Sequence, residues 1–191
     1  GTYTKATTLV VVRRDTTWAG AGWGIAGVER VYLQTAPALE GALVVFGDGS
    51  AIFYTKVGTN YVAPAGEYGT LAWVNNNHFE RTTDDHRVTV VYDANGLVST
   101  IRDTHTNTAN YAWVAAGSSV GGWKLNSITD PVGRVTTFGY TGDYLTGISQ
   151  PATNTVNITQ TSGRITQIND PDNFPTTFTY STYQRMASYQ G

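Results

Sequence analysis

The stretch SITDPVGRVTTFGYTG (residues 127–142) decides the fold, because it recurs forty residues further on as QINDPDNFPTTFTYST (167–182). Ile, Asp-Pro, Thr-Thr-Phe and Tyr occupy the same offsets in both copies, whereas most residues between them differ. A turn and an aromatic pair that recur at fixed offsets indicate an internal structural repeat. The recurrence therefore points to architecture before it points to chemistry.

Each copy reads as a β-hairpin. Asp130-Pro131-Val132-Gly133 has the preferences of a type I turn, with Asp first, Pro second and Gly last. Asp93-Ala94-Asn95-Gly96 follows the same logic without the Pro, and Asp170-Pro171-Asp172-Asn173 has Asn in place of the Gly. The strand after the turn carries an aromatic-x-aromatic pair, whose members share one face because side chains alternate along a strand.

The strand before each turn carries an apolar-x-x-apolar-x-Asp pattern. Its copies are Val98–Ile101–Asp103, Leu125–Ile128–Asp130 and Ile165–Ile168–Asp170, with a variant at Leu145–Ile148–Gln150. The aromatic pairs that follow the three Asp residues are Tyr111/Trp113, Phe138/Tyr140 and Phe178/Tyr180. Regular alternation predicts that the two apolar residues of each pattern point to opposite faces. A lone hairpin is marginal in water, so neighbouring units are expected to cover the aromatic rings.

The remainder of the chain is also rich in strand signals. Strands are predicted at 7–14, 28–34 and 87–92, and a hairpin at 42–55 that turns at Gly47-Asp48-Gly49. Pro37 and Gly41 leave no room for a helix between 33 and 45. The predicted fold is all-β, with antiparallel hairpin repeats in a curved or spiralling sheet. Residues 1–85 form a β-rich region that precedes about four repeats in 86–191, and both can share one continuous sheet.

Composition excludes several classes of function. The 191 residues carry a net charge of −2 with only 14% charged residues, which argues against a nucleic-acid partner. The absence of Cys excludes thiol catalysis, thiolate zinc sites and disulfides. The longest apolar run, LVVV (9–12), is too short to span a membrane, and GTYTKATT (1–8) lacks the apolar core of a signal peptide.

Several short motifs resemble functional sites but lack the required context. GSSVG (117–121), with Ser119 as nucleophile, needs a following helix and a downstream His, and has neither; AAGSSVGG (115–122) instead predicts a surface loop. GWGIAG (22–27) leads into a strand pattern rather than a nucleotide-binding helix. The His residues lack zinc-motif spacing, and the Asp-rich turns lack the distal Glu of a calcium loop. No catalytic residue, metal site or cofactor is therefore predicted.

Aromatic side chains are the strongest candidates for ligand contact. Trp18 and Trp23 flank the Gly-rich AGAG (19–22) and stand outside the repeat pattern. Exposed aromatic faces suit stacking on sugar rings, so these two residues are candidates for glycan contact. Trp113 occupies a repeat position and is therefore expected in the core.

The repeats resemble the RHS (rearrangement hotspot) or YD-repeat family. The residues that carry the resemblance are VVYDANGLVSTIRD (90–103), LNSITDPVGRVTTFGYTGDYLTGI (125–148) and SGRITQINDPDNFPTTFTY (162–180). The upstream segment 26–54 also resembles the β-rich region that often precedes such repeats. The resemblance implies hairpins wound into a long spiralling sheet, which can close into a hollow shell around a toxic polypeptide. Other members act at cell surfaces, where glycan binding is often suggested.

The chain departs from that family in three ways. Family members are usually much longer, the self-cleaving motif that ends the shell is missing, and a C-terminal effector domain is not recognisable. We therefore expect a fragment or a short relative: a non-catalytic structural module, secreted or on a bacterial cell surface. The alternative is a carbohydrate-binding or adhesive module. The implied partners are neighbouring repeats or another copy through edge strands, an enclosed polypeptide, or a glycan.

Overall fold

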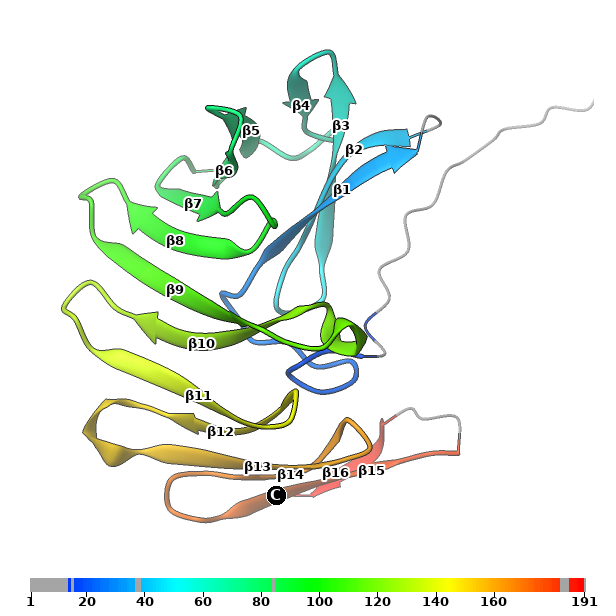
Figure 1. The fold of residues 1–191 in the computed structure, drawn as a ribbon, viewed down its shortest axis with the longest axis vertical. Coiled ribbons are helices and arrows are strands. Elements are labelled where there is room, and N and C mark those ends of the chain that lie inside the picture. Colours follow the sequence, from blue (N-terminus) through cyan, green and yellow to red (C-terminus); the bar gives the residue numbers. More distant parts are fainter. Residues whose placement is uncertain (1–13, 15, 37–38, 84, 183–185, 191) are drawn as a thin grey trace, which may run out of the picture.

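The computed structural model describes residues 14, 16–36, 39–83, 85–182 and 186–190. They form one antiparallel sheet of sixteen strands, in which each strand pairs with the next along the chain (Figure 1). The strands are β1 (Arg30–Ala36), β2 (Leu39–Val45), β3 (Ala51–Val57), β4 (Asn60–Val62), β5 (Thr70–Val74), β6 (His78–Thr82), β7 (Val88–Tyr92), β8 (Val98–Asp103), β9 (Thr108–Ala115), β10 (Trp123–Thr129), β11 (Val135–Thr141), β12 (Tyr144–Ser149), β13 (Thr155–Thr161), β14 (Arg164–Asn169), β15 (Pro175–Tyr180) and β16 (Met186–Gln190). The predicted all-β antiparallel hairpin fold is confirmed.

The sheet follows an open arc and is neither closed nor strongly curled (Figure 1). It runs without interruption from β6 to β7, across the boundary that separates the two sequence regions. Within the described residues, two single-turn 3₁₀ helices lie between strands: Ser118–Val120 between β9 and β10, and Pro151–Thr153 between β12 and β13. Over the described ranges, no helix has the length and apolar character needed to cross a membrane. The strand predicted at 7–14 lies outside the described residues apart from Arg14.

The Asp-led turns have the geometry that their sequences predict. The Asp130 carbonyl accepts a hydrogen bond from the Gly133 amide at 3.0 Å, and its carboxylate accepts from the amides of Val132 and Arg134. Gly133 has a φ of +85°, in the left-handed region that glycine adopts without strain. The equivalent residues in the other turns are Gly96, Thr106 and Asn173, all with positive φ. Each hairpin is thus a type I turn followed by one left-handed residue.

The apolar residues of each unit lie on the same face, so the prediction of opposite faces was wrong. A β-bulge separates them: Tyr140 pairs with Leu145, but Gly139 pairs with Gly147, which leaves Thr146 as an extra residue. Residues three apart in a regular strand point to opposite faces, but the extra residue shifts the alternation by one position. Leu145 and Ile148 therefore both point to the core. The same bulge follows the first apolar residue in every other unit: Val98, Leu125 and Ile165.

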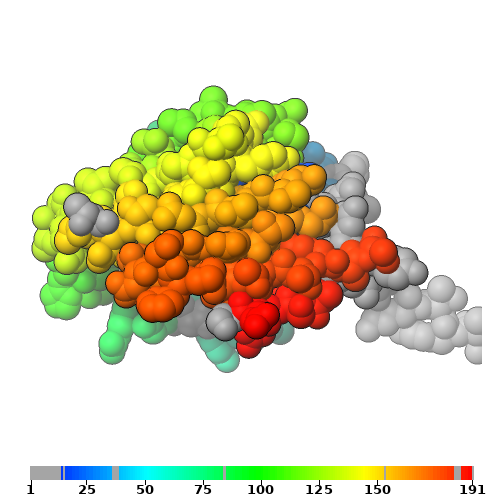
Figure 2. Space-filling view, turned by 90° about the horizontal axis from the view of Figure 1, so that it is seen from below, coloured from blue at the N-terminus to red at the C-terminus, as the bar shows by residue number. Residues whose placement is uncertain are grey.

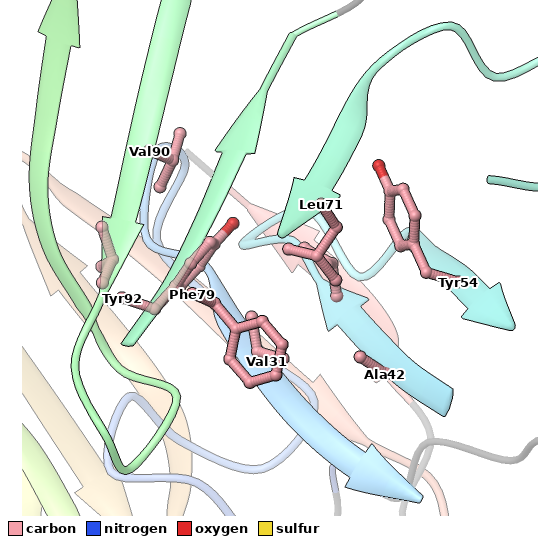
Figure 3. Close-up of a cluster of buried hydrophobic side chains, with 9 residues drawn as sticks. Val31, Ala42, Tyr54, Leu71, Phe79, Val90 and Tyr92 are labelled. Carbon is pink, nitrogen blue, oxygen red and sulfur yellow. The ribbon is translucent and has the colours of Figure 1, made fainter. Parts of the chain in front are cut away.

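Two apolar clusters lie on the inner side of the arc. The first joins β1–β3 to β5–β8 and contains Tyr54, Phe79 and Tyr92 (Figure 3). The Val31 amide in β1 donates to the Gly96 carbonyl in the β7–β8 turn at 2.8 Å, which holds the two ends of this cluster together. The second cluster follows the repeats from β9 to β15, and its buried members are Leu125, Phe138, Leu145, Ile158 and Ile165.

The N-terminal segment, residues 16–29, covers the second cluster. It lies inside the arc, in dark blue in Figure 1. The Leu145 amide donates to the Trp18 carbonyl at 2.9 Å, and the Ala21 amide donates to the Gly163 carbonyl at 2.7 Å. The first strand after the segment, β1, covers Arg30–Ala36, so it begins and ends two residues later than the strand predicted at 28–34.

Candidate functional site

A side-chain hydrogen bond recurs in every repeat unit and defines its architecture. A donor on the second strand reaches the backbone carbonyl of the first apolar residue, fifteen residues earlier in the chain. The four bonds run from Trp113 to Val98, Tyr140 to Leu125, Gln160 to Leu145 and Tyr180 to Ile165, at 2.7, 2.5, 2.8 and 2.6 Å. We call this bond the bulge tether, since every acceptor immediately precedes the bulged residue.

The tether explains why the second position of each aromatic pair is occupied by a residue that can donate a hydrogen bond. A bulge disrupts the regular ladder of backbone hydrogen bonds, and a buried carbonyl needs a donor. Tyr, Trp and Gln all present a donor at the end of a long side chain. Burial raises the pKa of the Tyr140 hydroxyl, so the hydroxyl keeps the proton that it donates to Leu125.

The structure places the predicted repeat residues in two groups. Asp103, Asp130 and Asp170 accept backbone amide hydrogen bonds in their turns, and Gly133 completes one of these turns. The aromatic pairs face the second cluster, and Phe138 is buried while the others are partly covered: Tyr111, Trp113, Tyr140, Phe178 and Tyr180. Trp113, which its repeat position predicts in the core, is half-buried and packs against both clusters.

Sequence reasoning missed the fourth donor, Gln160. Ile158 and Gln160 stand eight and ten residues after Gln150, at the offsets that the aromatic pairs have from Asp in the other units. Because neither residue is aromatic, a search for aromatic pairs passes over them. The spacing of Ile158 and Gln160 from Gln150 was the only sequence feature that could have identified this donor.

Trp18 and Trp23, the predicted glycan contacts, are half-buried against the repeats. The Trp18 ring makes edge-to-face contacts with Trp113, Phe138 and Tyr140, with ring centroids 6.0 to 6.4 Å apart. Trp23 packs on Phe178 at 5.0 Å, and its indole nitrogen donates to the Tyr180 hydroxyl at 3.4 Å. Both rings therefore take part in packing, and a sugar contact at either stays a prediction.

A buried charged cluster pins the N-terminal segment to the sheet. Arg81 in β6 donates to both carboxylate oxygens of Glu29, at 2.8 and 2.9 Å, and the Tyr92 hydroxyl donates to the same carboxylate at 2.5 Å. Burial raises the pKa of Tyr92, so the phenol stays protonated as a donor. Sequence reasoning missed this cluster because its members are 52 and 63 residues from Glu29 and share no motif.

A cavity of about 470 Å³ lies between the N-terminal segment, the β1–β2 hairpin and the loop before β10. Both candidate tryptophans reach it, together with Tyr32 and the loop residue Ser119. Its cationic residues also bond to backbone: Arg14 donates to the Trp23 carbonyl at 3.0 Å, and Arg30 to the Gly121 carbonyl at 3.2 Å. The cavity thus combines aromatic surface with hydrogen-bonding groups.

The remaining motifs do not assemble a reactive site within the described residues. Ser119 lies in a 3₁₀ turn, and no His is among the described residues that line its cavity. His78 contacts Asn77 and Glu80 instead. Across the described part of the chain, no group of three His, Cys, Asp or Glu side chains could hold a metal ion.

No model of a protein family matches the sequence, and a search of curated proteins gives no significant match.

Proposed function

We propose that this chain is a non-catalytic structural module of the RHS or YD-repeat type, part of a shell or surface scaffold that encloses or presents a toxic polypeptide. It would act outside the cell or on a bacterial surface. The observation that carries the proposal is the fourfold recurrence of one unit, with its bulge and its tether. A site for chemistry needs one distinctive constellation, whereas a scaffold needs one unit that can be stacked many times.

The contacts of the charged and aromatic side chains within the protein support this role. The carboxylates of the repeat turns bind backbone amides, the repeat aromatics pack in the second cluster and on Trp18 and Trp23, and the buried Arg81 is paired with Glu29. Groups that enzymes leave poised for a substrate are here used for internal bonds. The resemblance of the motifs at 90–103, 125–148 and 162–180 to YD repeats supplies the shell or scaffold as the context.

The experiment that tests the scaffold is the unfolding of Phe138→Ala in urea. Phe138 is buried in the second cluster, so its truncation should lower the free energy of unfolding by about 3–5 kcal/mol. The exposed Tyr68→Ala is the control and should change it by less than about 0.5 kcal/mol. A Phe138→Ala protein that unfolds at the same urea concentration as the unchanged chain would contradict the proposal.

The cavity favours a second candidate, a carbohydrate-binding module. Trp23 and Tyr32 present aromatic rings there, beside the guanidinium groups of Arg14 and Arg30. Tyr32 is the better probe because it is 45% exposed, whereas Trp23 also packs on Phe178. A glycan array should give binding that Tyr32→Ala abolishes with no loss of folding. Failure to bind any glycan would dispose of this candidate.

A further inference from the structure

The cavity beside the N-terminal segment lies where the chain departs from its repeat pattern. Strands β9 and β10 are joined by seven residues, 116–122, whereas two residues join β11 to β12 and two join β13 to β14. The Gly117 amide donates to the Asp143 carboxylate at 2.9 Å, which holds the longer connection in place. Its residues Ser118 to Gly121 line the cavity, whose volume of about 470 Å³ lies in the range of small-molecule sites, roughly 300–1,000 Å³.

One wall of the cavity is a single face of the β1–β2 hairpin. Arg30, Tyr32 and Gln34 are two residues apart along β1, so their side chains share this face. In β2, Leu43 and Val45 lie opposite two of them and line the same cavity. The wall thus combines two apolar side chains with a guanidinium, a phenol and an amide.

A second wall is the N-terminal segment, which the repeats support. Its Trp18 and Trp23 line the cavity and also pack on aromatic rings of the repeats. Seen from below, the strands of the repeats adjoin one another as bands from yellow to orange (Figure 2). The packed strands hold both indole rings in place before any ligand binds, which lowers the entropy lost on binding.

Arg30 carries a charge that no carboxylate pairs with among the described residues. Within the same part of the chain its guanidinium makes one hydrogen bond, from Nη1 to the Gly121 carbonyl at 3.2 Å, and its Nε is buried without a partner. The guanidinium carbon lies 4.8 Å from the centre of the Tyr32 ring, and this stacking orients the group. Arg30 is therefore held in position while most of its hydrogen-bonding capacity is unused.

The other charged residues in the described wall of the cavity are bonded inside the protein. The Glu29 carboxylate accepts two hydrogen bonds from Arg81, which balances its charge. Arg14 donates to the carbonyls of Trp23 and Gly47 at 3.0 and 3.4 Å. The remaining charge at the cavity is positive, and a positive cleft with apolar walls attracts anions.

We propose that the cavity binds a sugar residue that carries a carboxylate, with the carboxylate on Arg30. The free N–H groups of a guanidinium match the spacing of two carboxylate oxygens. Tyr32 and Trp23 offer ring surfaces to the C–H groups of the sugar. Gln34 and Ser119 offer hydrogen-bonding groups to its hydroxyls. This inference rests on the second candidate function, the carbohydrate-binding module, and specifies its ligand.

A neutral sugar does not satisfy the same site. It would cover Arg30 and remove water from the guanidinium without supplying a negative charge, and an unpaired charge is costly to bury. A carboxylate at this position replaces the lost water with charge-assisted hydrogen bonds. The geometry therefore favours an acidic sugar over its neutral counterpart.

The test compares oligomers of galacturonic, glucuronic, mannuronic and sialic acid with their methyl esters, by isothermal titration calorimetry on the full chain. Esterification keeps the sugar skeleton and removes only the charge. We expect at least one of the acids to bind, and its ester to bind about tenfold more weakly or worse. An ester that binds as tightly as its acid, or a failure of every acid to bind, would overturn the proposal.

Arg30→Gln assigns the preference to one residue. The variant should bind the acid about tenfold more weakly and the ester unchanged. Arg87→Gln makes the same change on a side chain that is 81% exposed and is not among the described residues of the cavity wall, so it should keep the preference. Urea unfolding checks that both variants fold. A folded Arg30→Gln protein that still prefers the acid would contradict the assignment, and the ester comparison on the unchanged chain holds whether or not the variant folds.

The proposal and the function on which it rests fail in distinguishable ways. Equal binding of acids and esters would remove the acidic ligand and leave the carbohydrate-binding module. Failure of both forms, together with no binding on the glycan array, would remove the module and the acidic site with it. The structural scaffold is tested separately, by the stability of Phe138→Ala.

Discussion

At the scale of single residues, each repeat unit depends on one side-chain hydrogen-bond donor, the donor of the bulge tether. Tyr140, Trp113 and Gln160 differ in size and aromaticity, yet each donates to a carbonyl fifteen residues earlier. A buried carbonyl without a hydrogen-bond donor lowers the stability of the fold by more than a formed hydrogen bond raises it. The donor is therefore the chemically restricted part of the unit, whereas its apolar neighbour tolerates Tyr, Phe or Ile.

Tyr140→Phe isolates this donor, since the ring remains and only the hydroxyl is lost. The Leu125 carbonyl then lacks its side-chain donor, so the free energy of unfolding should fall by about 1–3 kcal/mol. Urea unfolding measures the change, and Tyr68→Phe, on an exposed side chain, serves as the control. If both variants unfold alike, the hydroxyl does not support the bulge.

The turn carboxylates predict an acid-sensitive fold. The pKa of Asp103 is lowered from its ordinary value of 3.8, chiefly by the hydrogen bond from the Asn107 side chain. The unfolded chain then binds more protons than the folded chain in this range, so the contribution of Asp103 is complete above pH 3.8 and is lost as the pH falls through the lower folded value.

Asp103→Asn should therefore flatten the dependence of the urea midpoint on pH between about pH 2 and 5. Thr104→Ala, in the same turn, removes no titrating group and is the control. A variant whose midpoint falls with acid as steeply as that of the unchanged chain would show that Asp103 does not contribute.

At the scale of the element, each unit combines a turn that fixes the register with a bulge that fixes the face. Gly133 sits at the left-handed position of its turn, where a Cβ would meet no atom within 4 Å. The requirement at this position is thus conformational and not steric. Asn173 and Thr106 hold the same conformation in their own turns at φ values of +68° and +67°.

Gly133→Ala should lower the free energy of unfolding by about 1–2 kcal/mol, because alanine is strained at positive φ. Gly133→Asn should be less harmful, as Asn tolerates this conformation better. Gly139→Ala, in the adjoining strand and without a close neighbour, is the matched control. The order of the three urea midpoints tests the turn type, and an Ala variant as stable as the Asn variant would refute it.

At the scale of the whole molecule, the N-terminal segment joins parts of the sheet that are distant in sequence. Its two tryptophans pack on the repeats, and Glu29 binds Arg81 at the other cluster. A meander alone makes contacts only between consecutive strands. The segment therefore adds contacts between the two clusters to those that Trp113 makes with both.

Glu29→Gln breaks the buried ion pair and leaves the Arg81 charge without its partner, so stability should fall by about 3–5 kcal/mol. The matched control is Glu40→Gln, which breaks the more exposed pair with Lys56 and should lower stability much less than Glu29→Gln does. Urea unfolding of the two variants and of the unchanged chain measures both changes in the free energy of unfolding. Equal losses in the two variants would contradict the assigned role of Glu29.

The sequence predicted those features that depend on local chemistry. The turn at Asp130 and the hairpin between 42 and 55 both follow from residues within a few positions of each other. The facing of Leu145 and Ile148 could not be predicted in this way, since a bulge reverses alternation without a marker in the sequence. The packing of Trp18 and the pairing of Glu29 with Arg81 depend on contacts across the arc.

The long reach of the N-terminal segment has a consequence for the order of events during synthesis. Trp23 leaves the ribosome before Tyr180, to which its side chain donates a hydrogen bond and which is 157 residues later in the chain. At a translation rate of about 5–20 residues per second, roughly 8 to 30 s pass before this partner exists. The consecutive hairpins can form as they leave the ribosome, whereas the tryptophans stay exposed to solvent until the strands that cover them have been made. The segment 16–29, although it is made before the repeats, is therefore among the last of these elements to reach its final place.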